Sequence, residues 1–263
     1  MFQNGLNKSH PIPLYYQMAE IIREQIRLGK LKPGDCLPSE RELSDQAGIS
    51  RMTVRQALGY LIREGLLVAR PGLGTFVAEP KLVYDTLHLL AFTEEMMRQG
   101  EAPSSQVLEQ AVVEPPLHVA SALGLEPGET TVKIGRLRLS AGQPVLLETS
   151  HIPARLCPGL EAEELAERSL FALLEQTYHL RPQRSHQSLE ATVANEYEAG
   201  LFGIELGAAM FLLEGANYLE SGQPMEYFKA IYRGDRFKFE LESYRNDSVE
   251  LAPGARRLSV VME

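Results

Sequence analysis

The feature that most constrains this chain is a pair of short helical patterns joined by a tight turn near the N-terminus. Ser39 can cap a helix that ends at Ala47, and Ser50 can cap a second helix over residues 51–64. The Ala-Gly-Ile-Ser turn at 47–50 between them is typical of a helix-turn-helix. An amphipathic pattern over residues 13–28 predicts a further helix ahead of this pair.

Two β-prone runs follow the second helix and flank a glycine-bearing tip. Residues 66–69 and 75–77 favour strands, and Gly72 lies in the segment between them. Glycine at a hairpin tip lets the backbone approach a phosphate or a groove closely. The pattern therefore predicts a winged helix-turn-helix over residues 1–77, with the 51–64 helix in the major groove of DNA and the wing on the adjacent backbone or minor groove.

Charge divides the chain into two parts with different electrostatic roles. Residues 1–78 hold ten basic and seven acidic side chains, a net of +3, whereas residues 79–263 hold sixteen and twenty-eight, a net of −12. Because residues 1–78 are basic and residues 79–263 are acidic, we expect only the N-terminal part to bind nucleic acid. We therefore expect a linker at 78–84 and a second domain over 85–263.

The composition disfavours several other classes of protein. No apolar run reaches the ~20 residues that a membrane helix needs, so we expect a cytoplasmic protein with no membrane partner. The two cysteines, Cys36 and Cys157, are far apart and lack metal-ligand spacing, so neither a disulfide framework nor a metal site is expected. We also expect no cofactor.

An internal duplication organises the second part of the chain. The segment at 123–128 recurs at 202–207, and the Gly-Gln-Pro triplet at 142–144 recurs at 222–224. Each half reads as a helix, a glycine stop and a strand hairpin. Two such halves predict one antiparallel sheet with helices packed on one face, an α+β fold with a cleft between the halves.

Two arginines interrupt the first apolar strand of the duplicated part. Arg136 and Arg138 share one face of that strand about 7 Å apart, a spacing that suits a phosphate or a carboxylate. The alternative is two arginines on a solvated sheet face. Glu148 on the partner strand, and Glu226 with Tyr232 in the second half, could meet hydroxyl or amide groups.

Three motifs occur in order in the N-terminal part, at residues 38–43, 50–58 and 72–77. They resemble the DNA-binding domain of GntR-family bacterial transcription regulators. By position, the resemblance implies that DNA is contacted by Arg41, Ser50, Arg51, Thr53, Arg55 and Gly72. Arg41 could instead pair with Glu64 or Asp45 on the surface.

A second resemblance covers nearly all of residues 85–245. It is carried by residues 92–96, 123–129, 136–138, 148–150, 169–171 and 222–237. These are similar to the UTRA effector-binding domain of HutC-like GntR regulators, whose fold is related to chorismate lyase. By analogy with members that sense phosphorylated amino sugars, the phosphate would be held by Thr93, Arg136, Arg138 and Ser169, and the sugar would meet Glu148, Glu226 and Tyr232.

Three of these seven residues have simpler alternatives. Thr93 could cap the helix that starts at Glu94, and Ser169 could cap the helix over residues 170–176. Tyr232 could be a packed aromatic residue with its hydroxyl at the surface.

Together the resemblances imply a homodimeric repressor of a roughly palindromic operator on double-stranded DNA. Its effector would be a small anionic metabolite such as N-acetylglucosamine 6-phosphate or glucosamine 6-phosphate, and the alternative is a non-phosphorylated carboxylate. A lyase-like enzyme is disfavoured because the sequence has no nucleophile elbow, HExxH or phosphate-binding loop motif, so we expect no catalysis.

A DNA-binding protein whose second domain only dimerises is the remaining hypothesis. Arg136 and Arg138 argue against it, because buried charge without a ligand is costly. The apolar tail at 258–262 could still add an edge strand at a subunit interface.

Overall fold

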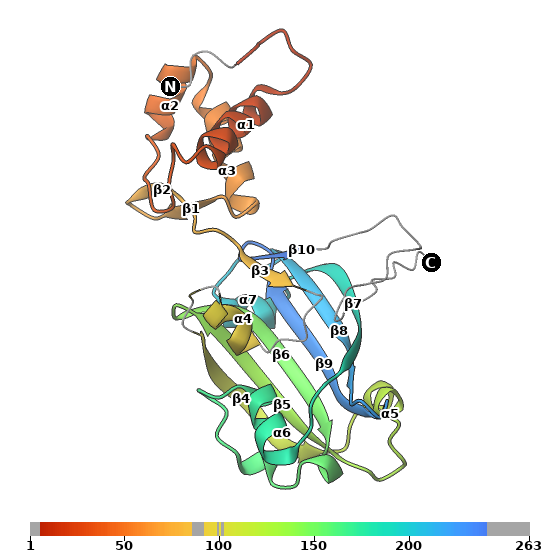
Figure 1. Cartoon of the computed structure of the whole chain (residues 1–263). Coiled ribbons are helices and arrows are strands. Elements are labelled where there is room, and N and C mark those ends of the chain that lie inside the picture. The colour runs from red at the N-terminus through yellow and green to blue at the C-terminus, as the bar shows by residue number, and fades with distance from the viewer. Residues whose placement is uncertain (1–5, 86–91, 99, 101–102, 241–263) are drawn as a thin grey trace, which may run out of the picture. The chain divides into compact units, whose positions relative to one another are not determined.

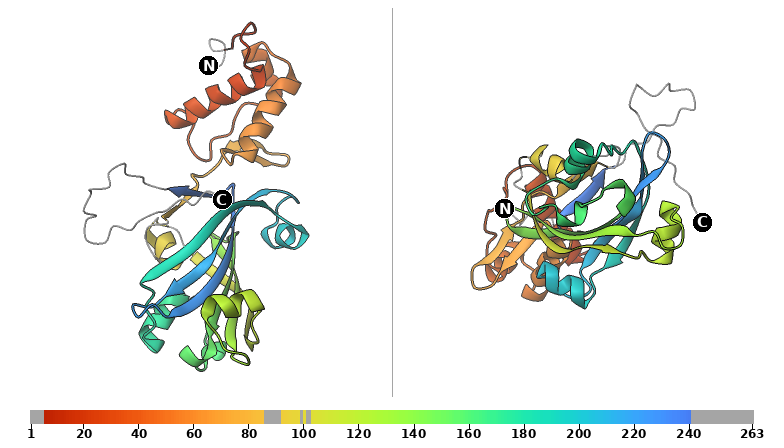
Figure 2. Two further views of the ribbon diagram at one scale, coloured as in Figure 1. Left: turned by 90° about the vertical axis from the view of Figure 1, so that its right-hand side faces the viewer. Right: turned by 90° about the horizontal axis from the view of Figure 1, so that it is seen from below.

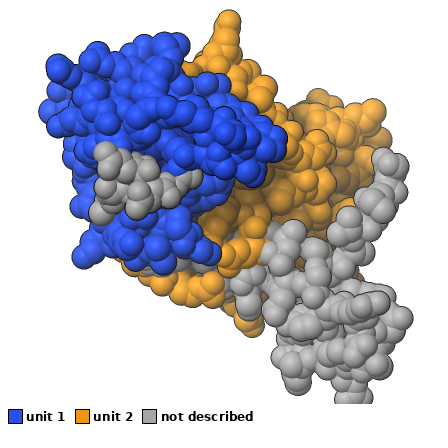
Figure 3. All heavy atoms as spheres, turned by 90° about the horizontal axis from the view of Figure 1, so that it is seen from above, with its two compact units in different colours: residues 1–81, 234–236 blue, residues 82–233, 237–263 orange. Residues whose placement is uncertain are grey.

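The computed structural model describes residues 6–85, 92–98, 100 and 103–240, and its chain forms two compact units (Figures 1 and 3). The N-terminal unit comprises residues 1–81 together with 234–236, and the C-terminal unit comprises residues 82–233 and the chain from 237 onward. Within the described residues, no helix is both long and apolar enough to cross a membrane.

The N-terminal unit is the predicted winged helix-turn-helix. Its elements are α1 (Leu14–Arg27), α2 (Glu40–Ala47), α3 (Arg51–Arg63), β1 (Leu67–Arg70) and β2 (Gly74–Val77). Ser39 and Glu42 form a capping box at the start of α2, and the Ser50 hydroxyl accepts the Thr53 amide at 3.1 Å at the start of α3. Gly48 ends α2 with φ +63°, a conformation that favours glycine, so the chain can turn directly into α3.

One core holds the three helices and the hairpin together. Its buried residues come from every element of the unit and include Met18, Ile22, Leu43, Val54, Leu61 and Leu67. Burying the apolar stripe of α3 leaves the other side of that helix in solvent, where Arg51 and Arg55 are exposed. The packing therefore presents the side of α3 that the sequence predicts to meet DNA.

The C-terminal unit is built on one antiparallel sheet of six strands in the order β4-β5-β6-β9-β8-β7 (Figure 1). A separate parallel pair joins β3 to β10. The elements are β3 (Leu82–Asp85), α4 (Phe92–Arg98), β4 (Pro103–Val113), α5 (Leu117–Leu123), β5 (Thr131–Ser140), β6 (Gln143–Pro153), η1 (Ala154–Leu156), η2 (Leu160–Ala162), α6 (Leu170–Tyr178), β7 (Arg184–Val193), α7 (Glu196–Phe202), β8 (Ala209–Tyr218), β9 (Pro224–Arg233) and β10 (Phe237–Glu240).

The internal duplication is confirmed element by element. The first half runs β4-α5-β5-β6 and the second β7-α7-β8-β9, and the halves join where β6 pairs with β9. Gly124 and Gly203 end the two equivalent helices with φ of +61° and +63°. The repeated Gly-Gln-Pro triplets lie at the two hairpin turns, as predicted.

Helices cover both faces of the sheet (Figure 2). The repeated helices α5 and α7 lie on one face, which confirms the predicted side for that pair. Helices α4 and α6 lie on the other face, so the expectation of helices on a single face was incomplete. The reason is that both faces carry apolar residues: Leu137 and Ile231 pack with Phe202 of α7, whereas Ile134 and Ile152 pack with Leu173 of α6.

Two sequence expectations concern the chain between and beyond these elements. We expect residues 78–84 to form a linker, but the last three of them belong to strand β3. This strand pairs with β10, which is far away in the sequence. The apolar tail at 258–262 lies outside the described residues.

Candidate functional site

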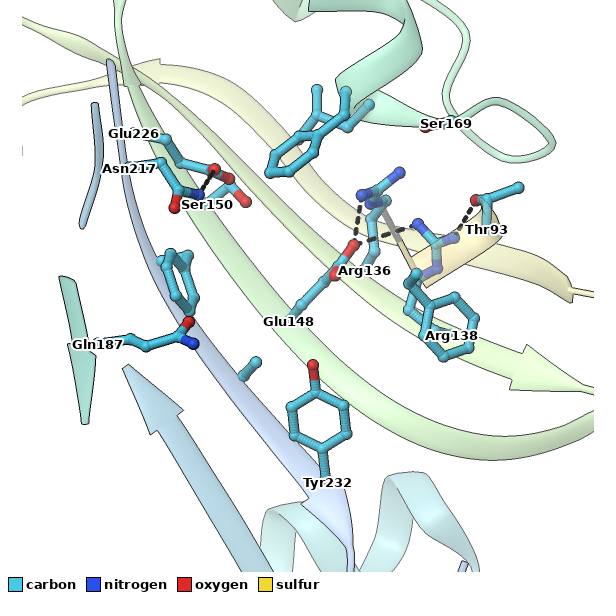
Figure 4. A pocket seen from close by; sticks show the side chains of 15 residues that line it. Thr93, Arg136, Arg138, Glu148, Ser150, Ser169, Gln187, Asn217, Glu226 and Tyr232 are labelled. Carbon is cyan, nitrogen blue, oxygen red and sulfur yellow. Dashed lines mark hydrogen bonds and ion pairs between the residues drawn. The ribbon is translucent and has the colours of Figure 1, made fainter. Parts of the chain in front are cut away.

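A pocket lies on the face of the six-stranded sheet that α4 and α6 cover (Figure 4). Strands from both halves of the duplication contribute to it, so it occupies the predicted junction between them. The fold brings together in its lining all of the predicted effector-contacting residues: Thr93, Arg136, Arg138, Glu148, Ser169, Glu226 and Tyr232.

Two buried arginines form one end of the pocket. Only 4% of Arg136 and 2% of Arg138 is exposed, so the alternative of a solvated pair is wrong. Glu148 lies directly opposite Arg136 on β6 and forms ion pairs with Arg136 and, at 3.2 Å, with Nη1 of Arg138. We call this cluster the arginine end.

Arg138 is fixed by further contacts from α4. Its Nη2 donates to Thr93 Oγ1 at 2.7 Å, and its guanidinium lies 4.7 Å from the centre of the Phe92 ring. Because α4 begins at Phe92, Thr93 lies inside the helix, and the alternative that it caps a helix starting at Glu94 is wrong. Burial lowers the pKa of Arg138 to about 10, so the side chain is still cationic at neutral pH.

The arginine end has more positive than negative charge. Burial alone would raise the pKa of Glu148, but attraction to Arg136 and Arg138 outweighs burial and holds that pKa below its ordinary value. Two cations therefore face one anion. The buried Nε atoms of both arginines also have no hydrogen-bond partner among the described residues. An anionic ligand would supply the missing charge and acceptors.

The N-terminus of α6 lies beside the arginines. Ser169 caps it, because its hydroxyl accepts the Ala172 amide at 3.2 Å, so the capping alternative is confirmed. Ser169 also lines the pocket with the first residues of α6, and Arg136 Nη1 donates to the Arg168 carbonyl at 3.4 Å. The start of a helix attracts anions through its free amides and its dipole.

A buried acid and an amide form the opposite end. Glu226 is 2% exposed, and its Oε2 accepts a hydrogen bond from Asn217 Nδ2 at 2.7 Å. Burial raises the pKa of Glu226, although hydrogen bonds from Ser150 and Asn217 oppose the shift. Tyr232 is a packed aromatic residue, 4.9 Å from the Phe237 ring, and Figure 4 shows its hydroxyl directed into the pocket.

We expect a Glu226→Gln variant to be more stable than the wild type at neutral pH. The folded-state pKa of Glu226 lies above its unfolded value of 4.5, so its ionisation opposes folding. That penalty is absent below the unfolded pKa and grows as the pH rises through the folded pKa. Thermal unfolding should give the variant the higher Tm at pH 7.5 and nearly equal Tm values near pH 4. A wild type that is more stable at pH 7.5 would show that the buried carboxylate stabilises the fold.

The sequence did not single out several lining residues, among them Ser150, Gln187 and Asn217. Asn217 gave a usable signal, because an amide stands there near the end of a largely apolar strand. Gln187 gave none, since most of its neighbours on β7 are polar as well.

Four of the six predicted DNA contacts lie at the start of α3. Ser50 is its N-cap, and Arg51, Thr53 and Arg55 follow within its first turns. The remaining two are Arg41 on α2 and Gly72 at the tip of the hairpin, where φ is +74°.

Ion pairs hold two of these arginines loosely at the surface. Arg55 contacts Glu40 with Nη2 at 2.7 Å and Nε at 2.9 Å, which ties the start of α2 to α3. Arg41 Nε lies 3.9 Å from Asp45, and about three-quarters of each side chain is exposed, with values of 74% and 73%. Exposed pairs of this kind contribute little stability, so both guanidiniums can exchange these carboxylates for another anion.

Comparison with known proteins agrees with the two units. Residues 14–77 match the gntR family of bacterial regulatory proteins, and residues 98–238 match the UTRA domain. The HTH-type transcriptional repressor NagR of Bacillus subtilis is 40% identical over 235 residues, which cover 89% of this chain and 96% of that protein. The mannosyl-D-glycerate transport/metabolism system repressor MngR of Escherichia coli is 32% identical over 90% of this chain and 98% of that protein.

A solved structure shows the same arrangement of elements. PhnF from Mycobacterium smegmatis aligns with a TM-score of 0.62 and 29% identity, over 87% of this chain and 99% of that one. The gntR family consists of bacterial regulatory proteins, and both NagR and MngR are named as repressors. The chain belongs to the gntR family of bacterial regulatory proteins and is a HutC-like transcription regulator in which a helix-turn-helix is joined to a UTRA domain.

Proposed function

We propose that this repressor acts as a homodimer on a roughly palindromic operator and is released when a phosphorylated amino sugar binds the pocket. N-acetylglucosamine 6-phosphate and glucosamine 6-phosphate are the effectors that we expect. The observation that carries the proposal is the arginine end, where two buried guanidiniums face one carboxylate beside the start of α6. A phosphate there would gain charge-assisted hydrogen bonds from both arginines.

In this proposal the sugar extends from the arginine end, where Glu148 lies, toward the opposite end of the pocket. Glu148, Glu226 and Tyr232 are candidate partners for its hydroxyl groups, while Thr93 and Ser169 assist the arginines with the phosphate. The polar and aromatic lining supports this orientation, because sugars present hydroxyls at their edges and apolar C–H groups on their faces.

Operator binding is assigned to the N-terminal unit. Arg51 and Arg55 would contact base edges from α3, and Arg41, Ser50, Thr53 and Gly72 would contact the operator around them. The two copies of α3 in a homodimer, its recognition helices, would enter major grooves about 34 Å apart. A palindromic operator therefore matches the symmetry of the proposed dimer.

The turn after β9 is our candidate for the link between the two sites. Residues 234–236 group with the N-terminal unit although β9, which carries Tyr232, runs directly into them. Lys81 Nζ donates to the Gly234 carbonyl at 2.7 Å. Gly65, just after α3, packs so closely that an added Cβ would lie 2.5 Å from the carbonyl oxygen of Asp235. A ligand that shifts β9 would therefore displace the turn that packs against Gly65, at the C-terminal end of α3.

A non-phosphorylated carboxylate effector is the second candidate. The relative MngR is named for mannosyl-D-glycerate, a sugar that carries a carboxylate instead of a phosphate. Arginine pairs bind both groups, so only the choice of ligand separates the two candidates.

Fluorescence anisotropy of a labelled duplex from upstream of the protein's own gene tests the proposal. The salt concentration must be fixed, because phosphate contacts make DNA affinity steeply salt-dependent. We expect N-acetylglucosamine 6-phosphate to release the duplex and N-acetylglucosamine to leave it bound. Release by mannosyl-D-glycerate alone would favour the carboxylate candidate, and tight DNA binding that no ligand changes would overturn the effector assignment.

A further inference from the structure

The wall of the pocket opposite the arginine end contains an unsatisfied buried acceptor. Asn217 is 3% exposed, and its Nδ2 donates a hydrogen bond to Glu226 Oε2 at 2.7 Å. Its Oδ1 is buried and has no hydrogen-bond partner among the described residues. Burying an amide oxygen without a hydrogen-bond donor costs the free energy of removing that oxygen from water. A ligand that donates a hydrogen bond to it recovers part of this cost and binds more tightly.

A second amide reaches the same wall because the backbones of β7 and β8 lie very close together there. Gln187 of β7 pairs with Gly215 of β8, two residues before Asn217 on the pocket side. A Cβ on Gly215 would lie 2.2 Å from the His186 carbonyl oxygen and 2.7 Å from the Gln187 Cα, which are both backbone atoms. Only glycine at 215 therefore allows β7 to lie this close to β8, where Gln187 lines the pocket (Figure 4).

The charges at this wall restrict what it can receive. Its polar groups are Ser150, Gln187, Asn217 and the acid Glu226, and none of them is a cation. A second anionic group on the ligand would meet Glu226 without a countercharge, which is costly in a buried site. An uncharged group with both donors and acceptors can instead pair with the two amides.

We propose that Asn217 and Gln187 form a second ligand subsite, the amide wall, which binds a neutral N–H- or O–H-bearing group at the end of the effector remote from its anion. This inference rests on the proposed function and narrows its ligand class to esters or acids that carry a single anionic group at one end and a hydroxyl or amide group at the other. The arginine end supplies attraction for the anion, and the amide wall selects among anions by the group they carry.

Isothermal titration calorimetry on the full chain tests the amide wall. The probes are N-acetylglucosamine 6-phosphate, which can reach both ends, and inorganic phosphate, which can occupy only the arginine end. For Asn217→Leu and for Gln187→Ala we expect the Kd of the sugar phosphate to rise about tenfold to a hundredfold, as when a buried hydrogen-bond partner is removed. The Kd for inorganic phosphate is expected to stay within about twofold of wild type.

Ser188→Ala is the matched control, because Ser188 follows Gln187 on β7 and does not line the pocket. It is expected to bind both probes like the wild type. Gln187 is only partly buried, so we expect Gln187→Ala to fold. If Asn217→Leu does not fold, Gln187→Ala alone tests the amide wall.

Each outcome has a distinct meaning. Selective weakening of the sugar phosphate supports the amide wall. Wild-type affinity for the sugar phosphate in the folded variants, or equal weakening of both probes, would overturn it while leaving the proposed function in place. If the wild type binds phosphate but no sugar phosphate, both the inference and the proposed effector class fall.

Discussion

Replacing Arg138 with alanine is expected to abolish the response to the effector while operator binding stays unchanged. The guanidinium is almost fully buried and is held by Glu148, Thr93 and the Phe92 ring, so its loss leaves Arg136 as the one guanidinium of the arginine end. Removing one partner of a buried charged contact weakens binding by roughly 3 kcal/mol, or about a hundredfold in Kd. Calorimetry with the sugar phosphate measures the loss, and anisotropy with labelled operator measures DNA affinity.

Arg155→Ala is the control for this experiment. Arg155 belongs to the same unit and is also paired, with Glu129 at 3.3 Å, but it is 44% exposed and does not line the pocket. We expect it to keep both affinities. If Arg138→Ala weakened operator binding as strongly as effector binding, the assignment of the two ligands to two separate units would be wrong.

Replacing Arg51 with alanine is expected to have the opposite effect, with operator binding lost and effector binding kept. Arg51 is the first residue of α3 and is exposed, so in the proposed complex it would be free to contact a base edge in the major groove, as arginine does with guanine. One such contact contributes roughly 1–3 kcal/mol, and the proposed homodimer would lose it twice. The Kd for the operator should therefore rise about thirtyfold or more, as measured by anisotropy at fixed salt.

Arg63→Ala is the control that distinguishes a specific contact to a base from the general effect of removing one positive charge. Arg63 is the exposed last residue of the same helix, and its removal changes the net charge equally. We expect it to change operator affinity far less than Arg51→Ala does. Equal losses in the two variants would mean that α3 attracts DNA through its overall charge and that Arg51 has no specific contact.

Local signals in the sequence predicted much of this fold. Capping residues and glycines in the left-handed conformation fix where helices begin and end, which is why the boundaries of α2 and α3 agree with the structure. The repeated segments predicted the two halves of the sheet. Arg136 and Arg138 were recognisable because a strand that is otherwise apolar does not bury arginines without a partner or a ligand.

Features that depend on distant parts of the chain could not be predicted in this way. The pairing of β3 with β10 joins segments at the two ends of the C-terminal unit, and α6 covers a sheet face whose apolar side chains alternate with those of the opposite face. Asn217 and Gln187 belong to this class as well. Their place in the pocket depends on how strands β7, β8 and β9 pair and on the close approach of β7 to Gly215, which only the three-dimensional structure reveals.

In the proposed mechanism the pocket and the operator-binding surface are energetically coupled, and two measurements of effector affinity test this coupling. Calorimetry would give the Kd of N-acetylglucosamine 6-phosphate for the free protein and for the protein saturated with operator. Coupling is reciprocal, so the effector must bind the operator complex more weakly by the same factor by which it lowers operator affinity, typically about fivefold or more. Equal Kd values for the free and the operator-bound protein would mean that the two sites are independent and that the effector does not release the operator.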